Sequence, residues 1–362
     1  MGQFSRLGMD WAFTGSVKNN SKKLRIGFVP LVDCAPIALA QELGLFKKRG
    51  LNVDLRREPG WASIRDKMAY GELEAAHAPV GLCFALSWGL GVLRKPCVTG
   101  YLINSNGDAI TVSKELSEAG VSNAESLASE IKTKQRDRPL CFGVPHLFST
   151  HHFLLLQWLR PFGIVPGPDI QIMVLPPSLM ASCLASGNID GYCVGEPFNS
   201  LAVEEGAGVI LAESANLSPM HPEKALIVSE SFERDNHEIH LLMIQAIKEA
   251  AILCETVDGR KRAAKILSSP EYLGITSNLI ESSLFCAKGK SKVEFTNENF
   301  HVFHHPDVNC PDSEKANWTI NQMRLAGLLD EIDGRKLPRP GAIFRKDIYE
   351  EAIDQTVIRA IA

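Results

Sequence analysis

The chain has 362 residues, of which 45% are hydrophobic and 22% are charged. This balance is typical of a globular protein and excludes a disordered chain. The length exceeds what a single hydrophobic core usually serves, so two lobes are expected. The formal net charge of −4 gives no support for nucleic acid or an anionic membrane as the main partner. An anionic ligand would therefore have to be attracted by local groups.

Cysteine usage and the N-terminal segment bear on the compartment. The nine cysteines contain no C-x-x-C motif, and several lie in apolar runs such as 82–84 and 140–142. This pattern favours free, buried thiols in a reducing compartment over a disulfide framework. Residues 1–23, interpreted as an N-terminal extension, lack an apolar core of signal-peptide length. We therefore expect a cytoplasmic protein, or a periplasmic one if a leader has been removed, with no membrane insertion.

An internal repeat organises the first 200 residues. A predicted strand at 24–30 has a counterpart at 140–146, and each is followed later by a helix that ends in glycine before another strand. Two pairs of glycines mark these landmarks, and both pairs are 116 residues apart: Gly27 with Gly143, and Gly71 with Gly187. A spacing shared by two separate landmarks predicts a duplicated structural unit.

Each unit reads as strand, helix, strand, helix, strand. Between the flanking strands, the expected elements are a helix at 36–46, a strand at 53–55 and a helix at 61–69, then in the second unit a helix at 150–162, a strand at 171–175 and a helix at 178–185. This alternation predicts α/β lobes with parallel sheets and right-handed crossovers. Two doubly wound lobes would place a ligand in the cleft between their strand ends.

The expected domain boundaries follow from this pattern. Lobe 1 comprises 24–105 plus 229–305, and lobe 2 comprises 106–228, with the chain passing between them near 104–110 and 221–228. Beyond the repeat, helices are predicted at 239–255, 260–267 and 318–329. The segment 306–362 is expected to be a helical tail that packs on lobe 1.

Five sequence blocks, in order, resemble the nitrate- and bicarbonate-binding receptors of ABC importers: 27–36 (GFVPLVDCAP), 61–67 (WASIRDK), 70–77 (YGELEAAH), 190–198 (DGYCVGEPF) and 221–226 (HPEKAL). Together they cover roughly 24–230. The resemblance implies a type II periplasmic-binding-protein fold that closes on a small anion, performs no chemistry and needs no cofactor. Cytoplasmic nitrate/nitrite sensors resemble these receptors but lack a leader, and the sequence is most similar to that branch.

The resemblance also implies a set of ligand-binding residues. Nitrate-binding members hold the anion with a Trp, a Gln, a Thr-His pair and a Lys. The matching positions in this sequence are Trp61, Asp108, Thr150, His151 and Lys224. Four further residues are expected to form the pocket wall: Asp33, Cys34, Pro36 and Glu196.

Asp108 departs from the family pattern because it stands where the receptors carry Gln. A carboxylate about 4 Å from a bound anion costs about 4 kcal/mol at an effective dielectric near 20. Three alternatives remain open: Asp108 turns away, it pairs with Lys224, or the ligand is not plain nitrate. Bicarbonate-binding members carry Glu and a bound calcium at the position of Lys224, so this lysine favours nitrate or nitrite.

Each of these residues also has an ordinary structural interpretation. The 149–151 segment opens a helix, whose free N–H groups attract anions, but it can equally be a simple helix cap. Trp61 can be core, and lysines such as Lys224 are usually solvated. Adjacent histidines, at 151–152 and 304–305, point in different directions on a helix, so no metal ligand is expected.

Three functions compete at this point. The first is a cytoplasmic nitrate/nitrite sensor that holds an RNA-binding antiterminator protein until the anion binds. The alternative is a receptor that delivers nitrate, nitrite, cyanate or bicarbonate to an ABC permease. A remote third is an enzyme like the thiamine-pyrimidine synthases that share the fold. The sequence shows no G-x-S-x-G or similar nucleophile motif, which favours binding over catalysis.

Overall fold

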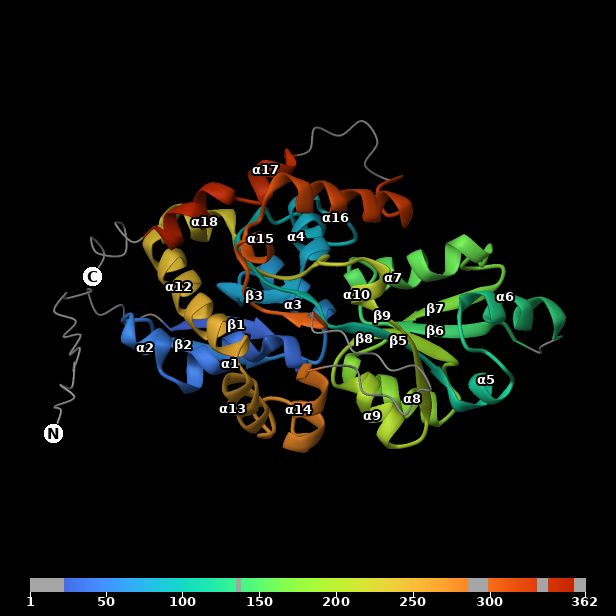
Figure 1. Cartoon of the computed structure of the whole chain (residues 1–362). Coiled ribbons are helices and arrows are strands. Elements are labelled where there is room, and N and C mark those ends of the chain that lie inside the picture. Colours follow the sequence, from blue (N-terminus) through green and yellow to red (C-terminus); the bar gives the residue numbers. More distant parts are fainter. Residues whose placement is uncertain (1–22, 135–137, 286–298, 331–337, 355–362) are drawn as a thin grey trace, which may run out of the picture.

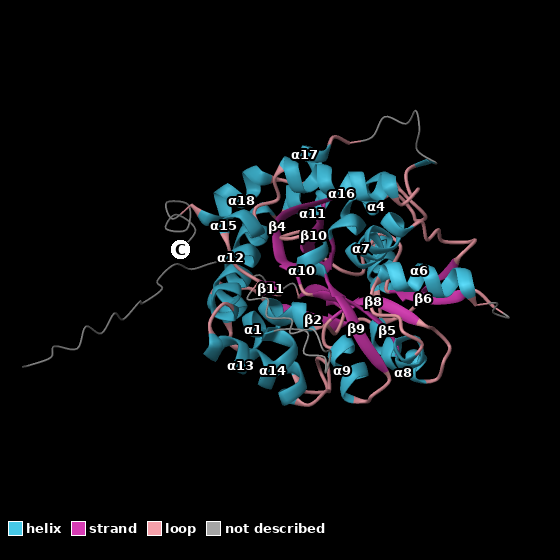
Figure 2. Cartoon of the chain, turned by 45° about the vertical axis from the view of Figure 1, so that its right-hand side comes forward, coloured by secondary structure: helices cyan, strands magenta, loops and turns pink. Residues whose placement is uncertain are grey.

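The computed structural model describes residues 23–134, 138–285, 299–330 and 338–354, so the predicted extension at 1–23 lies almost wholly outside the described residues. The chain forms two sheets whose strands converge at the centre of the molecule (Figure 1). The six-stranded sheet has the order β11-β4-β10-β3-β1-β2, and the five-stranded sheet has the order β7-β6-β8-β5-β9. Helices surround both sheets (Figure 2).

The strands are β1 (Leu24–Phe28), β2 (Val53–Arg57), β3 (Ala75–Pro79), β4 (Cys97–Asn106), β5 (Asp108–Ser113), β6 (Leu140–Val144), β7 (Ile170–Val174), β8 (Gly191–Gly195), β9 (Gly208–Glu213), β10 (Pro222–Ser229) and β11 (His301–Val302). The helices up to the end of the repeat are α1 (Ala35–Glu42), α2 (Leu45–Lys48), α3 (Trp61–Tyr70), α4 (Val80–Trp88), α5 (Lys114–Glu118), α6 (Ala124–Thr133), α7 (Thr150–Leu159), α8 (Met180–Ala185) and α9 (Phe198–Glu204). The later helices are α10 (Ser214–Leu217), α11 (Glu230–Asp235), α12 (His237–Cys254), α13 (Val257–Leu267), α14 (Ser277–Phe285), α15 (Pro306–Asn309), α16 (Ser313–Leu325), α17 (Pro340–Ile343) and α18 (Lys346–Ile353). Short 3-10 turns lie at Val32–Cys34, Arg160–Phe162 and Pro177–Leu179.

The 116-residue repeat is visible in the topology. β1 lies between β3 and β2, and β6 lies in the same way between β8 and β7. The pairing register also repeats. Ile26 is opposite Ala75 in the first lobe, and the residues 116 positions later, Phe142 and Gly191, are opposite each other in the second. The two lobes are therefore similar α/β units, which confirms the predicted fold class.

Sterics explain why both landmarks are glycines. A Cβ on Gly27 would lie 2.6 Å from the side chain of Leu73, which follows α3, and one on Gly143 would lie 2.8 Å from the sulfur of Met180 in α8, so both strands are closely covered at these places. Gly71 and Gly187 have φ values of 76° and 70°, in the left-handed region that ends a helix. The sequence repeat thus records backbone requirements that are shared by the two lobes.

The repeat strands pair in parallel as expected, but each sheet also contains antiparallel strands that the repeat did not predict. The three repeat strands of each lobe are parallel, but β10 runs antiparallel to β3 and β4, and β5 runs antiparallel to β8 and β9. These additional strands are where the chain enters or leaves a lobe. The first passage turns at Asn106 and Gly107, whose φ values are 61° and 97°.

The end of the second lobe also differs from the prediction, which extended this lobe to residue 228. The strand β10, Pro222–Ser229, pairs within the six-stranded sheet. The chain therefore returns to the first lobe between β9 and β10, through α10 and the residues before Pro222. As a result, β10 belongs to the first lobe.

The two lobes touch across the cleft. One hydrophobic cluster combines residues of both, including Leu31 of the first lobe with Phe148 and Phe153 of the second. The backbone N–H of Val32 donates to the carbonyl of Glu196 over 2.9 Å, which links the lobes directly. The structure is thus a closed form.

The C-terminal tail packs mainly against the first lobe. α16 contacts α4, and α18 contacts α12 and β4 (Figure 1). The tail also reaches the second lobe, because the Arg160 guanidinium donates to the carbonyl of Leu325 at the end of α16. Among the described residues, no helix has the length and apolarity that would let it span a membrane.

Eight of the nine cysteines lie in the described residues, and all eight are free thiols. Burial raises the pKa of several of them, including Cys83, so they are poor nucleophiles. We expect titration of the denatured, unreduced protein with a thiol reagent to count all nine cysteines. Recovery of two or more disulfides would contradict this expectation.

Candidate functional site

A bulge in β10 directs two consecutive charged side chains into one buried site. Pro222 is paired with Ser105 and Lys224 with Asn104, so one extra residue, Glu223, is accommodated between them. Adjacent residues on a regular strand point to opposite faces, and a bulge allows both to turn the same way. Glu223 and Lys224 are fully buried and ion-paired with each other.

Lys224 is surrounded by groups that stabilise its charge. Its Nζ lies 2.8 Å from Oδ2 of Asp33 and 5.0 Å from the centre of the Trp61 ring. Burial acts to lower the pKa of Lys224, but Asp33, Glu223 and Asp108 together raise it above the ordinary value. The lysine is therefore a buried ammonium and not a solvated surface residue.

Asp108 occupies in the second lobe the position that Lys224 occupies in the first. Lys224 is opposite Pro79 and Asp108 is opposite Gly195, each on a strand that runs antiparallel to the last strand of its repeat, and Gly195 lies one repeat of 116 residues after Pro79. Oδ1 of Asp108 lies 3.1 Å from Nε2 of His151, so the carboxylate faces the site. The ion pairs of Lys224 in the described residues are with Asp33 and Glu223 and not with Asp108. Burial raises the pKa of Asp108 to about 6.

The start of α7 supplies the residues contributed by the second lobe. Ser149 is the helix cap, because its hydroxyl accepts from the backbone N–H of His152. This leaves the buried Thr150 hydroxyl with no hydrogen-bond partner in the described part of the chain. The ring of His151 stacks on Trp61, with centroids 5.4 Å apart, so the two lobes meet at this contact.

The four residues expected in the pocket wall have different places. Asp33 is part of the charged cluster through its ion pair with Lys224. Cys34 packs into the core of the first lobe, and Pro36 lies in the first turn of α1. Glu196 is buried beside the cleft; its Oε2 accepts from the backbone N–H of Ser200 at 3.1 Å, and burial raises its pKa to about 8.

Four buried residues of the site were not identified from the sequence: His77, His221, Glu223 and His301. His77 Nε2 lies 3.3 Å from Oδ1 of Asp33, and His221 Nδ1 lies 3.6 Å from Oε2 of Glu223. The 221–226 block already contained a signal, since His221 and Glu223 are two residues apart at the start of a strand. His301 comes from a distant segment, so sequence spacing could not reveal it.

The histidines do not balance the charge of the carboxylates. Burial lowers the pKa of His77, His151 and His221 to about 4, and that of His301 to about 3, so all four are neutral near pH 7. Lys224 therefore faces three carboxylates. Several buried polar atoms of the described cluster have no hydrogen-bond partner: Trp61 Nε1, Thr150 Oγ1, both oxygens of Asp108, Glu223 Oε2, and both ring nitrogens of His77, His151, His221 and His301.

Comparison with known proteins places the chain in a family. Residues 17–268, more than two thirds of the sequence, match the NMT1-like family. The chain belongs to the NMT1-like family. The match spans both lobes and includes all five ligand-binding residues predicted from the sequence.

Two relatives of this NMT1-like chain are components of transport systems. The nitrate import ATP-binding protein NrtC of Synechocystis sp. is 35% identical over 311 residues, which is 85% of this chain and 46% of NrtC. The bicarbonate transport ATP-binding protein CmpC of the same organism is 34% identical over 310 residues, 84% of this chain and 46% of CmpC. The chain thus spans about half the length of these relatives.

A solved structure matches the fold closely. The periplasmic nitrate-binding protein NrtA from Synechocystis PCC 6803 superposes with a TM-score of 0.83, covering 91% of this chain and 88% of NrtA at 22% identity. At this identity the likeness establishes the two-lobed fold alone. The NMT1-like chain thus has the two-lobed periplasmic-binding-protein fold.

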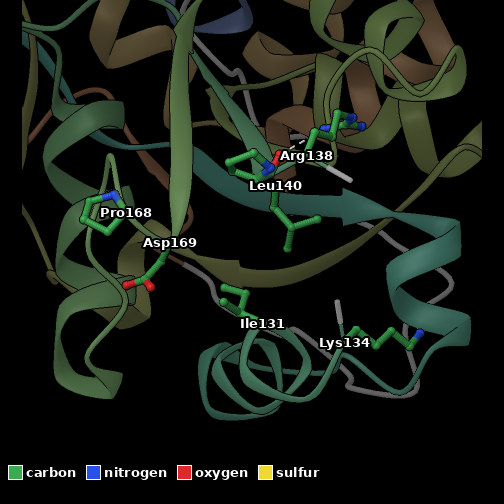
Figure 3. Close-up of a pocket in the computed structure, with 7 residues that line it drawn as sticks. Ile131, Lys134, Arg138, Leu140, Pro168 and Asp169 are labelled. Carbon is green, nitrogen blue, oxygen red and sulfur yellow. Dashed lines mark hydrogen bonds between the residues drawn. The ribbon is translucent and has the colours of Figure 1, made fainter. Parts of the chain in front are cut away.

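A surface pocket of about 290 Å³ lies elsewhere in the second lobe (Figure 3). Its lining residues are Ile131, Lys134, Arg138, Pro139, Leu140, Pro168 and Asp169. They surround the start of β6, whereas Thr150 and His151 follow the end of that strand. This pocket is therefore separate from the charged cluster between the lobes.

Proposed function

We propose that the chain is a solute-binding protein that holds a small inorganic anion, nitrate or nitrite, between its lobes without chemical conversion. The observation that carries this proposal is a set of buried donors: the Trp61 indole N–H and the Thr150 hydroxyl, which have no partner among the described residues, and the Lys224 ammonium, which is paired with Asp33 and Glu223. A buried donor without a partner costs free energy, and an anion accepts from all three.

The position of α7 supports the same proposal. Thr150 and His151 open a ten-residue helix, where backbone N–H groups and the helix dipole favour negative charge. The donors come from both lobes, so a ligand held by all of them stabilises the closed form. The relatives that import nitrate or bicarbonate fit a planar oxoanion as the ligand.

The biological role that these relatives support best is that of a receptor or binding module of an ABC importer, with the permease and ATPase as partners. Both are named as parts of nitrate or bicarbonate transport. The sensor role, with an antiterminator protein as partner, is a second proposal. It is favoured by the eight free thiols of the described residues, which suit a reducing compartment.

The two roles give different results when the anion is added. A sensor is expected to release its antiterminator protein in a pull-down assay, while an importer module is expected to change the ATPase rate of the reconstituted transporter. Whichever partner responds to nitrate identifies the role. Neither role involves turnover of the anion, so an observed conversion of the ligand would contradict both.

Anion binding itself is tested by calorimetry and tryptophan fluorescence. Titration with nitrate, nitrite, cyanate and bicarbonate is expected to give one site per chain and to change the emission of Trp61. Trp61→Phe keeps an aromatic ring but removes the N–H, and should weaken binding by about tenfold or more because the anion loses a charge-assisted hydrogen bond.

Trp158→Phe is the matched control, since Trp158 is buried in the core of the second lobe, away from the cluster. It should bind the anion as the wild type does and retain the fluorescence response. The proposal is wrong if none of the four anions binds to the wild-type protein, or if Trp61→Phe and Trp158→Phe behave alike.

A further inference from the structure

We propose that Asp108, His221 and Glu223 form a binding site for a divalent transition-metal ion, for which Zn²⁺ is the best-fitting probe. One ligand atom from each residue can be chosen so that all three lie within 4.8 Å of one another. The three side chains are at most 2% exposed. The sequence predicted no metal ligand, because the three residues come together only in the fold.

The spacing of the His221 and Glu223 ligand atoms suits a tetrahedral ion. Zn–N and Zn–O bonds of about 2.0–2.2 Å place two ligands on a tetrahedral zinc about 3.4 Å apart. Nδ1 of His221 is 3.6 Å from Oε2 of Glu223. Asp108 stands on β5 and the other two residues stand at the start of β10, so the ligands come from both chain passages between the lobes.

Unpartnered ligand atoms are a second, independent indication. Both oxygens of Asp108, Oε2 of Glu223 and both ring nitrogens of His221 are buried and make no well-aligned hydrogen bond to any described residue; the one close contact is that of Asp108 Oδ1 with Nε2 of His151 at 3.1 Å. Each of these atoms carries a lone pair when it is deprotonated. The arrangement thus presents acceptors to a common point, which is what a cation requires and an anion does not.

The charges of the cluster also call for a cation. Lys224 supplies one positive charge and is ion-paired with Asp33 and Glu223, which leaves Asp108 beside a second carboxylate. Two buried carboxylates this close together raise the free energy of the folded protein, and a divalent ion would balance their excess negative charge.

The presence of His221 among the ligands indicates which class of ion fits the site. Imidazole nitrogen suits zinc and its first-row neighbours, whereas calcium and magnesium prefer oxygen ligands only. The ring of His221 is held in place by Trp318 of α16, which stacks on it with centroids 5.9 Å apart and an interplanar angle of 18°. This stacking fixes the plane of the imidazole ring.

A bound cation would also assist the proposed anion, and this part of the inference rests on the proposed function. Without a cation, Asp108 and Glu223 repel an anion that is held by Trp61, Thr150 and Lys224. Neutralising the two carboxylates removes that repulsion. We therefore expect zinc to increase nitrate affinity, and by thermodynamic reciprocity nitrate to increase zinc affinity by the same factor.

The test is a titration of the full, chelator-treated protein with zinc chloride, combined with metal analysis after dialysis. The wild type should bind one zinc ion per chain, and its affinity for calcium or magnesium should be lower than its affinity for zinc. His221→Gln and Glu223→Gln should each reduce zinc affinity by about 100-fold, at least as much as the loss of a supporting residue costs. His152→Gln is the matched control, because that buried ring is bonded to the Leu147 carbonyl and is not part of the cluster.

The outcomes separate this inference from the proposed function. Zinc binding that His221→Gln leaves unchanged, or calcium binding as tight as zinc binding, would overturn the metal site. So would failure of the wild type to bind zinc, in which case Asp108 and Glu223 share a proton. Nitrate titrated in the presence of chelator tests the anion site alone, so either site can fail while the other stands. If His221→Gln does not fold, Glu223→Gln and Asp108→Asn, which preserve side-chain shape, give the same comparison.

Discussion

Lys224→Ala is expected to weaken anion binding by at least about 30-fold, because a charged contact to a buried anion is worth roughly 2–5 kcal/mol. The lysine is fully buried and approaches the face of Trp61, so no solvent replaces the lost charge. Calorimetry with nitrate and nitrite measures the effect. Lys67→Ala removes an ion-paired lysine of the same lobe, whose partner is Glu58, and should leave binding unchanged.

The same substitution should also destabilise the protein. Asp33 and Glu223 lose their common cation, and breaking a buried ion pair costs roughly 3–5 kcal/mol. Denaturant unfolding measures this cost. The double variant Lys224→Met with Asp33→Asn removes both charges of one pair and should recover part of the stability, but not anion binding. Wild-type affinity in any folded variant that lacks the lysine would contradict its assignment as an anion ligand.

The fold could be predicted from the sequence because the repeat reflects strong local requirements. Gly27 and Gly143 allow side chains to pack closely on the strands, and Gly71 and Gly187 end helices in the left-handed region. These needs act on single residues and so appear as fixed spacing. The antiparallel strands could not be predicted in the same way, since their direction depends on how the chain passes from one lobe to the other.

The candidate site could be predicted only in part. Trp61, His151 and Lys224 lie together in the structure, as their match to the ligand positions of the receptors suggested. Glu223 was missed because an alternating strand would turn it away from Lys224, and the bulge that reverses this depends on the pairing of β10 with β4. His301 was missed because its contact with the first chain passage, at Gly107, joins segments far apart in the sequence.

The site is assembled only when the lobes close, and Gly81 at the start of α4 controls how closely they approach. A Cβ on Gly81 would lie 2.4 Å from the backbone carbonyl oxygen of Phe148, in the opposite lobe. That oxygen belongs to the segment before α7 and cannot rotate aside as a side chain can. The methyl group of Gly81→Ala would therefore push the lobes apart near Thr150 and His151.

Gly81→Ala is expected to weaken anion binding by about 5- to 100-fold, because overpacking of this kind costs roughly 1–3 kcal/mol and falls on the closed form. Scattering in solution should show a more open molecule at saturating nitrate. One hydrophobic cluster spans both lobes, so the unfolding midpoint without ligand should also fall. Gly341→Ala is the control, since a Cβ there meets no atom within 4 Å and should alter neither property. Unchanged affinity in a folded Gly81→Ala protein would show that the anion does not depend on this closed arrangement, and that its ligands come from one lobe.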